Sequence, residues 1–515
     1  MRKNNNFSYF PEYTWAVLLF MVGVLFFVYG FNNILFLRPQ GIHQWRQCDC
    51  LSFALNYYNH DATFFHPAIQ YLGKDGTGKT ASGFPGLYFI IAKIWKITGY
   101  HEFTYRIIIL LIAFSGLFAL TKTVEDILKD SLIAVFVAMI LFTSTIFVYY
   151  SNNFLMNVPA LSMALVALYF FYKFYQTGKN RNLYLSVLFF TIGGLLKITA
   201  LMGFVAILGI FALEWILKIK FGHGGYLFKH PRKQIVPFLV VILFVASWYF
   251  YAAHYNANHN SGIFLIGILP IWKIGRPHIQ EIIHYVRVLW LNSYHSEWMQ
   301  VISVLLLAVL ILYYKKVHKF LGVFTFFLTI GFFIFLVLFF QVFAHHDYYL
   351  TNQLILMISI FTSFFYLLKT HCNKIFKSLI FRFLLLILLV YNVKICANNI
   401  HNRYHVKWEN PHLMTTITLE HITPCLRSLG IKRTDPMLVE QDGSFDISLY
   451  LMDQKGYTTF GGKFKDSTEI HQAIIHRNLK YLLVTDSNLL KKDYLKPFLY
   501  DQIGKYKNNY IFKLK

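Results

Sequence analysis

Long apolar runs alternate with short, lysine-rich polar segments along most of the chain. A helix that crosses the hydrocarbon core of a bilayer needs about 20 apolar residues. Runs near this length occur at residues 15–37, 104–122, 131–150, 155–176, 183–199, 200–219, 235–256, 299–314, 320–343, 352–369 and 377–396. The first run is longer than a signal-peptide core, and no small-residue cleavage site follows it. The pattern predicts a polytopic α-helical membrane protein with about 11 (11 to 13) transmembrane helices, the first of them retained.

The basic segments between the runs predict the orientation of the chain. Short loops rich in lysine and arginine stay on the cytoplasmic side. The candidates are "MRK", "TKTVEDILKD", "YQTGKNRN", "KIKFGHGGYLFKHPRK", "YKKVHK" and "KTHCNKIFK". All fall on one side if residues 86–99, "GLYFIIAKIWKITG", lie in the membrane interface and do not cross. The N-terminus is then cytoplasmic, and the C-terminus lies outside.

Three longer polar segments become extracytoplasmic in this topology: residues 38–103, residues 257–298 and the tail from residue 397. In the tail, "DPMLVEQDG" and "NLKYLLVTDS" predict short buried strands, "FDISLYLMD" predicts a helix, and "KNNYIFKLK" predicts a closing edge strand. We therefore expect a transmembrane domain over residues 1–396 and a small extracytoplasmic α/β domain over residues 397–515.

Composition supports the membrane assignment and excludes other classes of protein. Of 515 residues, 56% are hydrophobic and only 14% are charged, which leaves too little polar surface for a soluble protein of this size. The net charge is +24, but the basic residues are spread among the apolar runs, so nucleic acid is not an expected partner. The five cysteines show no C-x-x-C spacing and indicate neither a disulfide framework nor a zinc site.

The stretch "GKDGTGKT" at residues 73–80 fits the phosphate-binding pattern G-x-x-x-x-G-K-[ST]. That pattern cradles phosphate only where a buried strand leads into the loop and a helix follows it. Here Pro67 disfavours a central strand before the loop, and the Gly and Pro of "ASGFPGLY" oppose a helix directly after it. The loop also lies outside in the predicted topology, where ATP is absent. We therefore expect a flexible glycine-rich loop.

Arg46 and Asp49 follow the first span closely, in "RPQGIHQWRQCDCLSFALNYY". A carboxylate at the edge of the hydrocarbon is poorly solvated, which raises its pKa and suits it to act as a general base. The same spacing also allows a purely structural ion pair between the two residues on one helix face. The spacing alone leaves both interpretations open.

Three motifs of this segment, in their order, resemble a known enzyme family. "HQWRQCD", "FFHP" and "SGFPGLYFIIAKIWKITGYHEFTYRI" resemble the first outside loop of the GT-C glycosyltransferases of the family-39 type, which include protein O-mannosyltransferases and the lipid A aminoarabinose transferase. The resemblance extends over most of the membrane part. It implies a GT-C fold with a cytoplasmic N-terminal helix and juxtamembrane helices in the first outside loop, and it implies that Asp49 is the catalytic acid/base residue.

The resemblance also implies a reaction. Nucleotide sugars are absent outside the cytoplasm, so the sugar arrives on a polyprenyl phosphate and is passed to an extracytoplasmic lipid, glycan or protein. Inversion needs one carboxylate as base, because the phosphate leaves as a stable anion, whereas glycosidases usually need two carboxylates. Relatives often carry a second acidic residue where this chain has Gly83, and Asp75 or His66 are candidate substitutes. An alternative interpretation of His66 is a turn residue before Pro67.

Polar residues at the outer ends of predicted spans are candidates for binding the donor phosphate. They are Arg106, Lys197, His345, His346, Asp347 and Tyr348, and in the first loop Arg46 and His66 are also candidates for substrate binding. An intramembrane charge such as Lys197 indicates a functional site, and a lipid phosphate is its natural partner. The resemblance supports a donor-site role for "FAHHDYYLTNQ". The alternatives are snorkelling for Lys197, membrane anchoring for Arg106 and an interfacial cap for the histidine segment.

Other polar residues have weaker claims. Asn153 and Asn157 are candidates for hydrogen bonds to sugar, or they mark a helix start. His278 and His284 are six residues apart and form no H-E-x-x-H pattern, so an amphipathic helix is expected there. We expect no cofactor other than the lipid-linked donor, and no metal.

Two other functions stay open. A multi-pass transporter or flippase for a lipid-linked or polar substrate would explain the spans, although inverted repeats are not evident. A structural membrane protein would make Asp49 dispensable. The sequence does not identify the sugar, the acceptor, the lipid length or the oligomeric state. Its Phe-, Lys- and Asn-rich composition indicates an AT-rich bacterial genome. We therefore expect the protein in a bacterial inner membrane, with the outside loops in the periplasm or outside the cell.

Overall fold

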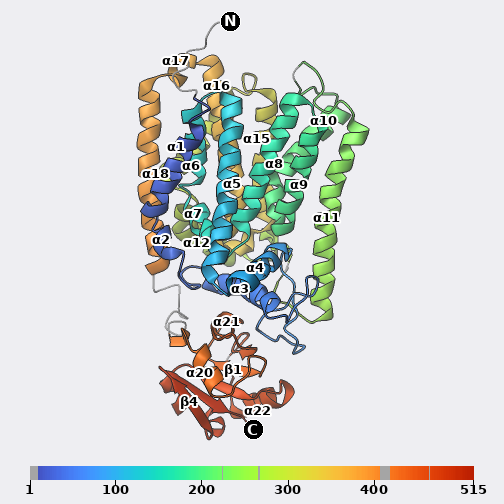
Figure 1. Cartoon of the computed structure of the whole chain (residues 1–515). Coiled ribbons are helices and arrows are strands. Elements are labelled where there is room, and N and C mark those ends of the chain that lie inside the picture. The colour runs from blue at the N-terminus through green and yellow to red at the C-terminus, as the bar shows by residue number, and fades with distance from the viewer. Residues whose placement is uncertain (1–9, 223, 265–266, 406–417, 463, 515) are drawn as a thin grey trace. The chain divides into compact units, whose positions relative to one another are not determined.

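The computed structural model describes residues 10–222, 224–264, 267–405, 418–462 and 464–514, and it is mostly helical (Figure 1). The chain forms two compact units, each assembled from separate stretches of sequence. Unit 1 comprises Met1–Phe36, Tyr105–Trp248 and Gly267–Asn402, and unit 2 comprises Leu37–Thr104, Tyr249–Ile266 and Arg403–Lys515. The basic N-terminal "MRK" and residues 406–417 of the predicted tail lie outside the described residues.

Unit 1 is built from apolar helices joined by short connections. Its first half contains α1 (Thr14–Val28), α2 (Phe31–Ile34), α5 (Glu102–Leu128), α6 (Ser131–Leu141), α7 (Thr145–Ser151), α8 (Asn157–Thr177), α9 (Asn180–Leu196), η1 (Ile198–Leu201), α10 (Met202–Ile216) and α11 (Pro231–Asn258), whose end belongs to unit 2. Its second half contains η2 (Ile271–Lys273), α12 (Arg276–Tyr285), η3 (Val286–Trp290), α13 (Leu291–Tyr294), α14 (Glu297–Leu312), α15 (Lys319–Leu338), η4 (Phe340–Ala344), η5 (Asp347–Gln353), α16 (Leu354–His371), α17 (Asn373–Phe376) and α18 (Leu379–His405).

The predicted spans coincide with helices in the structure. Among the described residues, seven helices are long and apolar enough to cross a membrane, or up to nine if each of two bent helix pairs is one span. The bent pairs are Ser131–Leu141 with Thr145–Ser151, at 78°, and Arg276–Tyr294 with Glu297–Leu312, at 90°. The runs predicted at residues 15–37 and 183–199 form shorter helices, α1 with 15 residues and α9 with 17. The helix α4 (Gly86–Thr98), predicted not to cross, has 13 residues, fewer than a bilayer requires.

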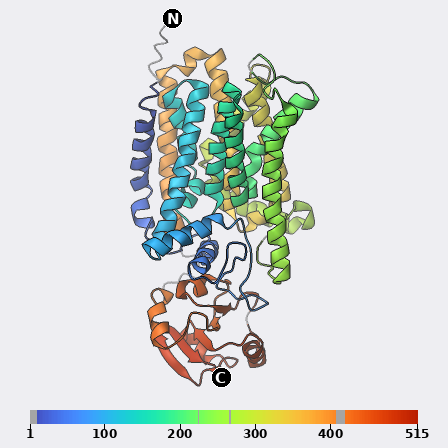
Figure 2. The ribbon, with the colours of Figure 1, turned by 45° about the vertical axis from the view of Figure 1, so that its right-hand side comes forward.

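Small residues allow the helices of unit 1 to approach closely. A Cβ added at Gly193 of α9 would lie 3.0 Å from the carbonyl oxygen of Ala160 in α8, and one at Gly116 of α5 would lie 2.7 Å from the Cα of Ser162. The helices α8 and α9 accordingly lie side by side (Figures 1 and 2). Close backbone approach replaces the hydrophobic effect as the source of helix association in lipid.

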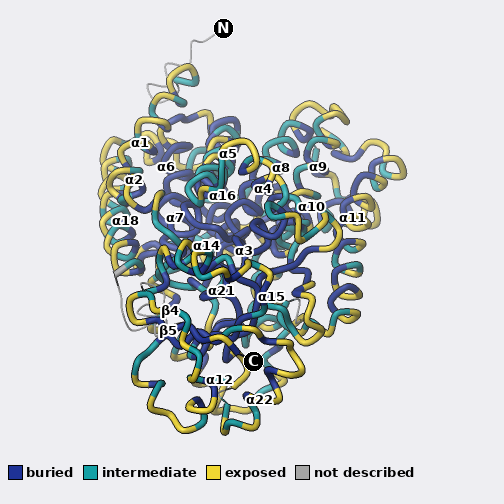
Figure 3. The backbone as a smooth tube through the Cα atoms, turned by 60° about the horizontal axis from the view of Figure 1, so that its bottom comes forward, coloured by how far each residue is buried: buried dark blue, intermediate teal, exposed yellow. Residues whose placement is uncertain are grey.

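The helices of unit 1 differ in how much of their surface the protein covers (Figure 3). The most apolar window of the span Asp347–His371, which contains α16, is 89% buried, whereas the corresponding window of α18 is 17% buried. Exposed leucine, isoleucine and phenylalanine side chains cover α18. An apolar helix surface of this kind is suited to contact with lipid.

The carboxylates of "TKTVEDILKD" have specific cationic partners. Glu125 binds the Lys122 ammonium at 2.7 Å, and the buried Asp126 binds Lys173 of α8 at 2.6 Å. Asp130 caps α6 and accepts a 2.8 Å hydrogen bond from Arg382 of α18. An unpaired carboxylate in this position would be costly to desolvate, so each carboxylate stays with its cation. Because Lys173 and Arg382 lie on other helices, these pairs hold the helices together at this end of the bundle.

Unit 2 combines the first predicted outside loop with the C-terminal segment. It contains α3 (Gln44–Tyr58), α4, α20 (Thr423–Ser428), β1 (Met437–Glu440), α21 (Ile447–Met452), β2 (Gly456–Thr458), α22 (Ser467–His476), β3 (Tyr481–Val484), η6 (Ser487–Lys491), η7 (Lys496–Phe498), β4 (Gln502–Tyr506) and β5 (Asn509–Lys513). The strands form one sheet in the order β2-β1-β3-β5-β4. The first three are parallel to one another, and β5 pairs antiparallel with β3 and β4.

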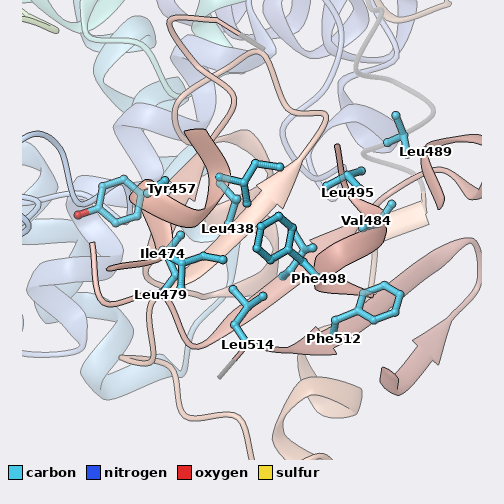
Figure 4. Packing of buried hydrophobic residues seen from close by; sticks show 13 residues of the cluster. Leu438, Tyr457, Ile474, Leu479, Val484, Leu489, Leu495, Phe498, Phe512 and Leu514 are labelled. Carbon is cyan, nitrogen blue, oxygen red and sulfur yellow. The ribbon is translucent and has the colours of Figure 1, made fainter. Parts of the chain in front are cut away.

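The core of this sheet confirms two predicted strands and corrects the predicted edge. Leu438 of β1, Leu482 and Val484 of β3 and Phe512 of β5 are buried in one apolar cluster (Figure 4). The segment "KNNYIFKLK" was expected to be the edge strand, but β5 lies between β3 and β4, and β4 is the edge. The pattern of β4 concealed it, because "QIGKY" buries no side chain fully and contains a bulge at Gln502/Gly504.

Candidate active site

Asp49 lies on α3 and is 2% exposed. The helix begins after His43, whose φ of 58° turns the chain sharply into it. The Oδ2 atom of Asp49 lies 3.3 Å from Nη1 of Arg46, one turn earlier. Its other oxygen, Oδ1, is buried and accepts no hydrogen bond within the part of the chain that is described. The structure thus contains the ion pair that the spacing allowed, and one carboxylate oxygen is left for another donor.

Arg46 is held in place by further contacts. Its Nη2 donates a 2.8 Å hydrogen bond to the hydroxyl of Ser82, just before α4. Its guanidinium lies 4.9 Å from the ring centroid of Phe264. Because the planar group has few ways to satisfy these contacts together, it fixes the orientation of the Asp49 carboxylate.

Burial raises the pKa of Asp49 to about 7. The positive charge of Arg46 and its hydrogen bond act in the opposite direction and lower the pKa. Desolvation is the larger effect, because the carboxylate loses almost all of its contact with water and gains only one partner. A carboxyl group with a pKa near neutrality suits the role of a general base.

A second carboxyl group, that of Asp446, lies near Asp49 within unit 2. Asp446 precedes α21 and is fully buried. Its Oδ1 accepts a 3.2 Å hydrogen bond from the backbone N–H of Tyr71, and its side chain also bonds to Ser52, one turn after Asp49 on α3. Sequence reasoning missed this residue, because no spacing rule brings a helix start in the tail next to the first loop.

Different neighbours act on the ionisation of the two carboxyl groups. Burial raises the pKa of Asp446 well above its ordinary value, and the charge of Asp49 raises it further. Arg46 stabilises only the ionised form of Asp49. Burial and the charge of Asp49 therefore disfavour the ionised form of Asp446, whereas Arg46 favours the ionised form of Asp49.

The other residues considered in the first loop have different partners. The exposed His66 bonds through Nδ1 to the Thr63 hydroxyl at 2.8 Å, as a turn residue would. The Asp75 carboxylate accepts hydrogen bonds from Thr77 and lies 2.7 Å from Nδ1 of His259. The stretch "GKDGTGKT" is a turn, with α4 starting only at Gly86, so it lacks the geometry of a nucleotide-binding loop.

In unit 1, Lys197 lies at a break between α9 and η1. Its extended backbone, with φ −157° and ψ 117°, ends the helix, and its ammonium lies 4.3 Å from the ring centroid of Tyr349. No carboxylate pairs with Lys197 among the described residues, and the side chain is half-buried. A cation held against an aromatic ring in the membrane unit has the properties expected of an anion site.

Arg106 is fully buried near the start of α5. Its guanidinium lies 4.2 Å from the ring centroid of Phe154 and donates to the carbonyl oxygen of Asn152. Tyr105 donates to the carbonyl oxygen of Phe154 at 3.0 Å. These contacts hold the turn between α7 and α8.

The histidine segment divides into exposed and buried residues. His345 is exposed, whereas Asp347 is fully buried and accepts a 2.6 Å hydrogen bond from the Tyr150 hydroxyl. The ring of His346 lies 5.1 Å from that of the buried Tyr348, whose carbonyl oxygen accepts a 2.9 Å hydrogen bond from Asn157. Asp347 and Tyr348 thus form hydrogen bonds with residues on either side of the α7–α8 turn.

Buried amides without partners surround this turn. Both side-chain polar atoms of Asn152 and of Gln353, and Nδ2 of Asn153, form no hydrogen bond among the described residues. Buried amides are normally satisfied by protein or water. No pattern in the sequence distinguishes these residues from other asparagines at helix ends.

Metal ligands do not gather in the part of the chain that is described, where no group of three or more His, Cys, Asp or Glu could hold a metal ion. The predicted amphipathic segment after residue 257 forms α12, on which the side chains of His278 and His284 are exposed.

Known proteins resemble this chain in family pattern and fold. The family model "Dolichyl-phosphate-mannose-protein mannosyltransferase" matches residues 82–250. ArnT from Cupriavidus metallidurans bound to undecaprenyl phosphate superposes with a TM-score of 0.57 at 11% identity, covering 97% of this chain and 98% of ArnT. Apo ArnT gives a TM-score of 0.55 at 9% identity, covering 98% of both chains. No curated protein matches the chain by sequence.

A larger enzyme shares the same fold. The arabinofuranosyltransferase AftD from Mycobacteria superposes with a TM-score of 0.55 at 12% identity, covering 97% of this chain and 40% of AftD. At these identities the superpositions establish a common fold, and substrates do not follow from them.

Proposed function

We propose that the chain is a membrane glycosyltransferase of the GT-C type, which transfers a sugar from a polyprenyl-phosphate donor to an extracytoplasmic acceptor. The observation that carries this proposal is Asp49, a buried carboxylate with one oxygen held by Arg46 and a pKa of about 7. The undecaprenyl phosphate in the ArnT complex supports a lipid-linked donor for this chain as well.

Asp49 acts as the general base in the proposed reaction. An acceptor hydroxyl or amine gives its proton to the carboxylate and attacks C1 of the donor sugar. The bond between C1 and the phosphate oxygen breaks, and the polyprenyl phosphate leaves with the electron pair. The leaving group needs no acid, so one ionised carboxylate suffices and the configuration at C1 is inverted.

The residues near Asp49 support this protonation scheme. Arg46 keeps the carboxylate in one orientation, and burial disfavours a second negative charge on Asp446.

Lys197 is the proposed ligand of the donor phosphate. It has no carboxylate partner among the described residues and lies at a helix break in the membrane unit. An ammonium in this setting is stabilised by a lipid phosphate. Arg106, His346, Asp347 and Tyr348 are proposed to shape the donor site through the turn between α7 and α8.

We propose that the N-terminus is cytoplasmic and that unit 2 lies on the periplasmic or outer side of a bacterial inner membrane. The basic connections of unit 1 support this orientation. No resident metal is part of the proposal.

The test uses the purified full-length protein in lipid nanodiscs with polyprenyl-phosphate sugars labelled in the sugar. Transfer of label to envelope lipid, glycan or protein, with release of polyprenyl phosphate, is expected for wild type and not for Asp49→Asn. A product with the donor's own anomeric configuration, read by NMR, would contradict inversion. A flippase would move the labelled lipid across a vesicle membrane and release no polyprenyl phosphate.

A further inference from the structure

The glycine-rich segment at residues 73–80 borders a pocket of about 230 Å³ in unit 2. The φ values of Gly73, Gly76 and Gly78 are 71°, 77° and 71°, which residues with a side chain rarely adopt. A Cβ at Gly78 would lie 2.8 Å from the carbonyl oxygen of Ile69. The backbone N–H of Gly78 donates to the carbonyl oxygen of Leu72 at 2.8 Å. The segment therefore has a fixed shape that depends on its glycines.

Hydrogen bonds connect the other wall of the pocket to this segment. Residues 259–263 form that wall, and the hydroxyls of Thr80 and Ser261 lie 2.5 Å apart. Asn256 accepts a 2.6 Å hydrogen bond from the N–H of Ala81 and donates one of 2.8 Å to its carbonyl oxygen. Because both walls are bonded together, the pocket exists before any ligand arrives.

Positive charge exceeds negative charge around the pocket. Lys74 and Lys79 both line it, and neither ammonium has an ion pair or hydrogen bond among the described residues. Asp75 also lines it, but its carboxylate accepts hydrogen bonds from the N–H and hydroxyl of Thr77 and lies 2.7 Å from His259. Since Asp75 is already satisfied, the two lysines remain to attract an anion.

Aromatic side chains complete the lining. Tyr71 and Phe460 both border the pocket, with ring centroids 6.2 Å apart. Aromatic rings beside cationic groups give a ligand apolar contact and charge neutralisation together. That combination matches a sugar ring that carries a phosphate or carboxylate group.

The pocket is connected to the Asp49 site through the chain and through edge-to-face contacts between aromatic rings. Thr80 lines the pocket, and two residues later Ser82 bonds to Arg46, the partner of Asp49. The ring of Phe264, beneath Arg46, lies 5.7 Å from that of Phe445, which lies 5.4 Å from Phe460. One chain segment and one series of ring contacts therefore connect the pocket to Arg46, the partner of the proposed base.

We propose that this pocket is an acceptor subsite that binds the phosphate or carboxylate group of an anionic saccharide. Lys74 and Lys79 neutralise the charge, and Tyr71 and Phe460 contact the sugar ring. The assignment of the bound saccharide as acceptor rests on the proposed function, whereas its binding requires no transfer.

Binding is measured by isothermal titration calorimetry on the full-length protein in detergent. The probes are glucose 6-phosphate, trigalacturonate, neutral maltotriose and inorganic phosphate. At least one anionic saccharide is expected to bind more tightly than maltotriose and inorganic phosphate, and the pair of anionic probes distinguishes a phosphorylated from a carboxylated ligand. Equal binding of maltotriose, or of inorganic phosphate, would overturn the proposal.

Variants locate the binding and separate it from catalysis. Lys74→Glu/Lys79→Glu is expected to weaken anionic-saccharide binding by about tenfold or more, because two attractive charges become repulsive. Lys491→Glu/Lys492→Glu, with the same charge change at exposed positions of unit 2, is the control and keeps wild-type binding. Asp49→Asn keeps binding even where transfer is lost. Wild-type affinity in the Lys74/Lys79 variant, with its thermal stability retained, would refute the subsite.

Discussion

Nη1 of Arg46 lies 3.3 Å from Oδ2 of Asp49, and the same guanidinium donates at 2.8 Å to the hydroxyl of Ser82. Arg46 thus joins the proposed base on α3 to the segment that precedes α4. One carboxylate oxygen is held in this way, and Oδ1 is left for an acceptor proton.

Replacement of Asp49 by Asn is expected to lower the rate of sugar transfer by about 10²- to 10⁴-fold, the usual contribution of a general base. The isosteric amide cannot accept the acceptor proton. The rate is measured as label transferred from the lipid-linked sugar at saturating donor. Asp446→Asn is the matched control, because an amide resembles the protonated carboxyl group, the form that burial favours at Asp446. If Asp446→Asn lost as much activity as Asp49→Asn, the assignment of the base to Asp49 would be contradicted.

The pH dependence of kcat/KM is expected to report the ionisation of Asp49. Activity requires the deprotonated form, so kcat/KM rises with pH through about 7 and then levels off. Arg46→Gln removes the charge that lowers this pKa, so the inflection moves to higher pH. Arg46→Lys retains the charge and is expected to shift it less. A profile that is flat across neutrality would exclude Asp49 as the titrating base.

Lys197 is expected to contribute to donor binding. Lys197→Ala removes the ammonium at the break between α9 and η1 and should raise the KM for the lipid-linked donor by about tenfold, with a smaller change in kcat. Lys197→Arg keeps the charge and should restore part of the affinity. Lys374→Ala, an exposed lysine of unit 1, is the control. An unchanged KM in Lys197→Ala would support the alternative, a snorkelling lysine without a ligand.

The apolar pattern predicted the helices of unit 1 well, because length and hydrophobicity suffice to specify a membrane helix. The lysines of "GLYFIIAKIWKITG" and its shortness correctly set α4 apart from the longer helices. Strands were harder to predict. Buried β1 and β3 were found, whereas β4, with few buried side chains, left no signal.

The sequence predicted only part of the candidate site. Asp49 and Arg46 are three residues apart, so helix geometry alone brought them together. Asp446 reaches Asp49 only through tertiary packing, in which α21 lies against α3. The pocket beside residues 73–80 likewise depends on residues 259–263, which no local pattern connects to the glycine-rich loop.

Chelation of divalent metal is expected to leave transfer unchanged. The proposed mechanism uses Arg46 and Lys197 as its cations and an anionic leaving group that needs no acid. EDTA treatment followed by dialysis should therefore preserve the initial rate, and added Mg²⁺ or Mn²⁺ should not increase it. Loss of activity with EDTA and recovery with one of these metals would show that a metal site is required.

Asp446 is expected to make unit 2 less stable at neutral pH than a neutral residue of the same size would. Burial raises the pKa of its carboxyl group in the folded protein well above the ordinary value of 3.8, at which it ionises in the unfolded chain. Because the folded pKa is raised, the contribution of the protonated Asp446 to stability is fully present below the unfolded pKa of 3.8. It is lost as pH rises from there through the folded pKa. Asp446→Asn removes this proton linkage, so its melting temperature should exceed that of wild type at pH above neutrality, by about 2–4 °C per kcal/mol. Below the ordinary pKa the two proteins should melt alike. The measurement is thermal unfolding over a pH series, and a variant that melts lower than wild type throughout the series would show that Asp446 stabilises the fold in its ionised form.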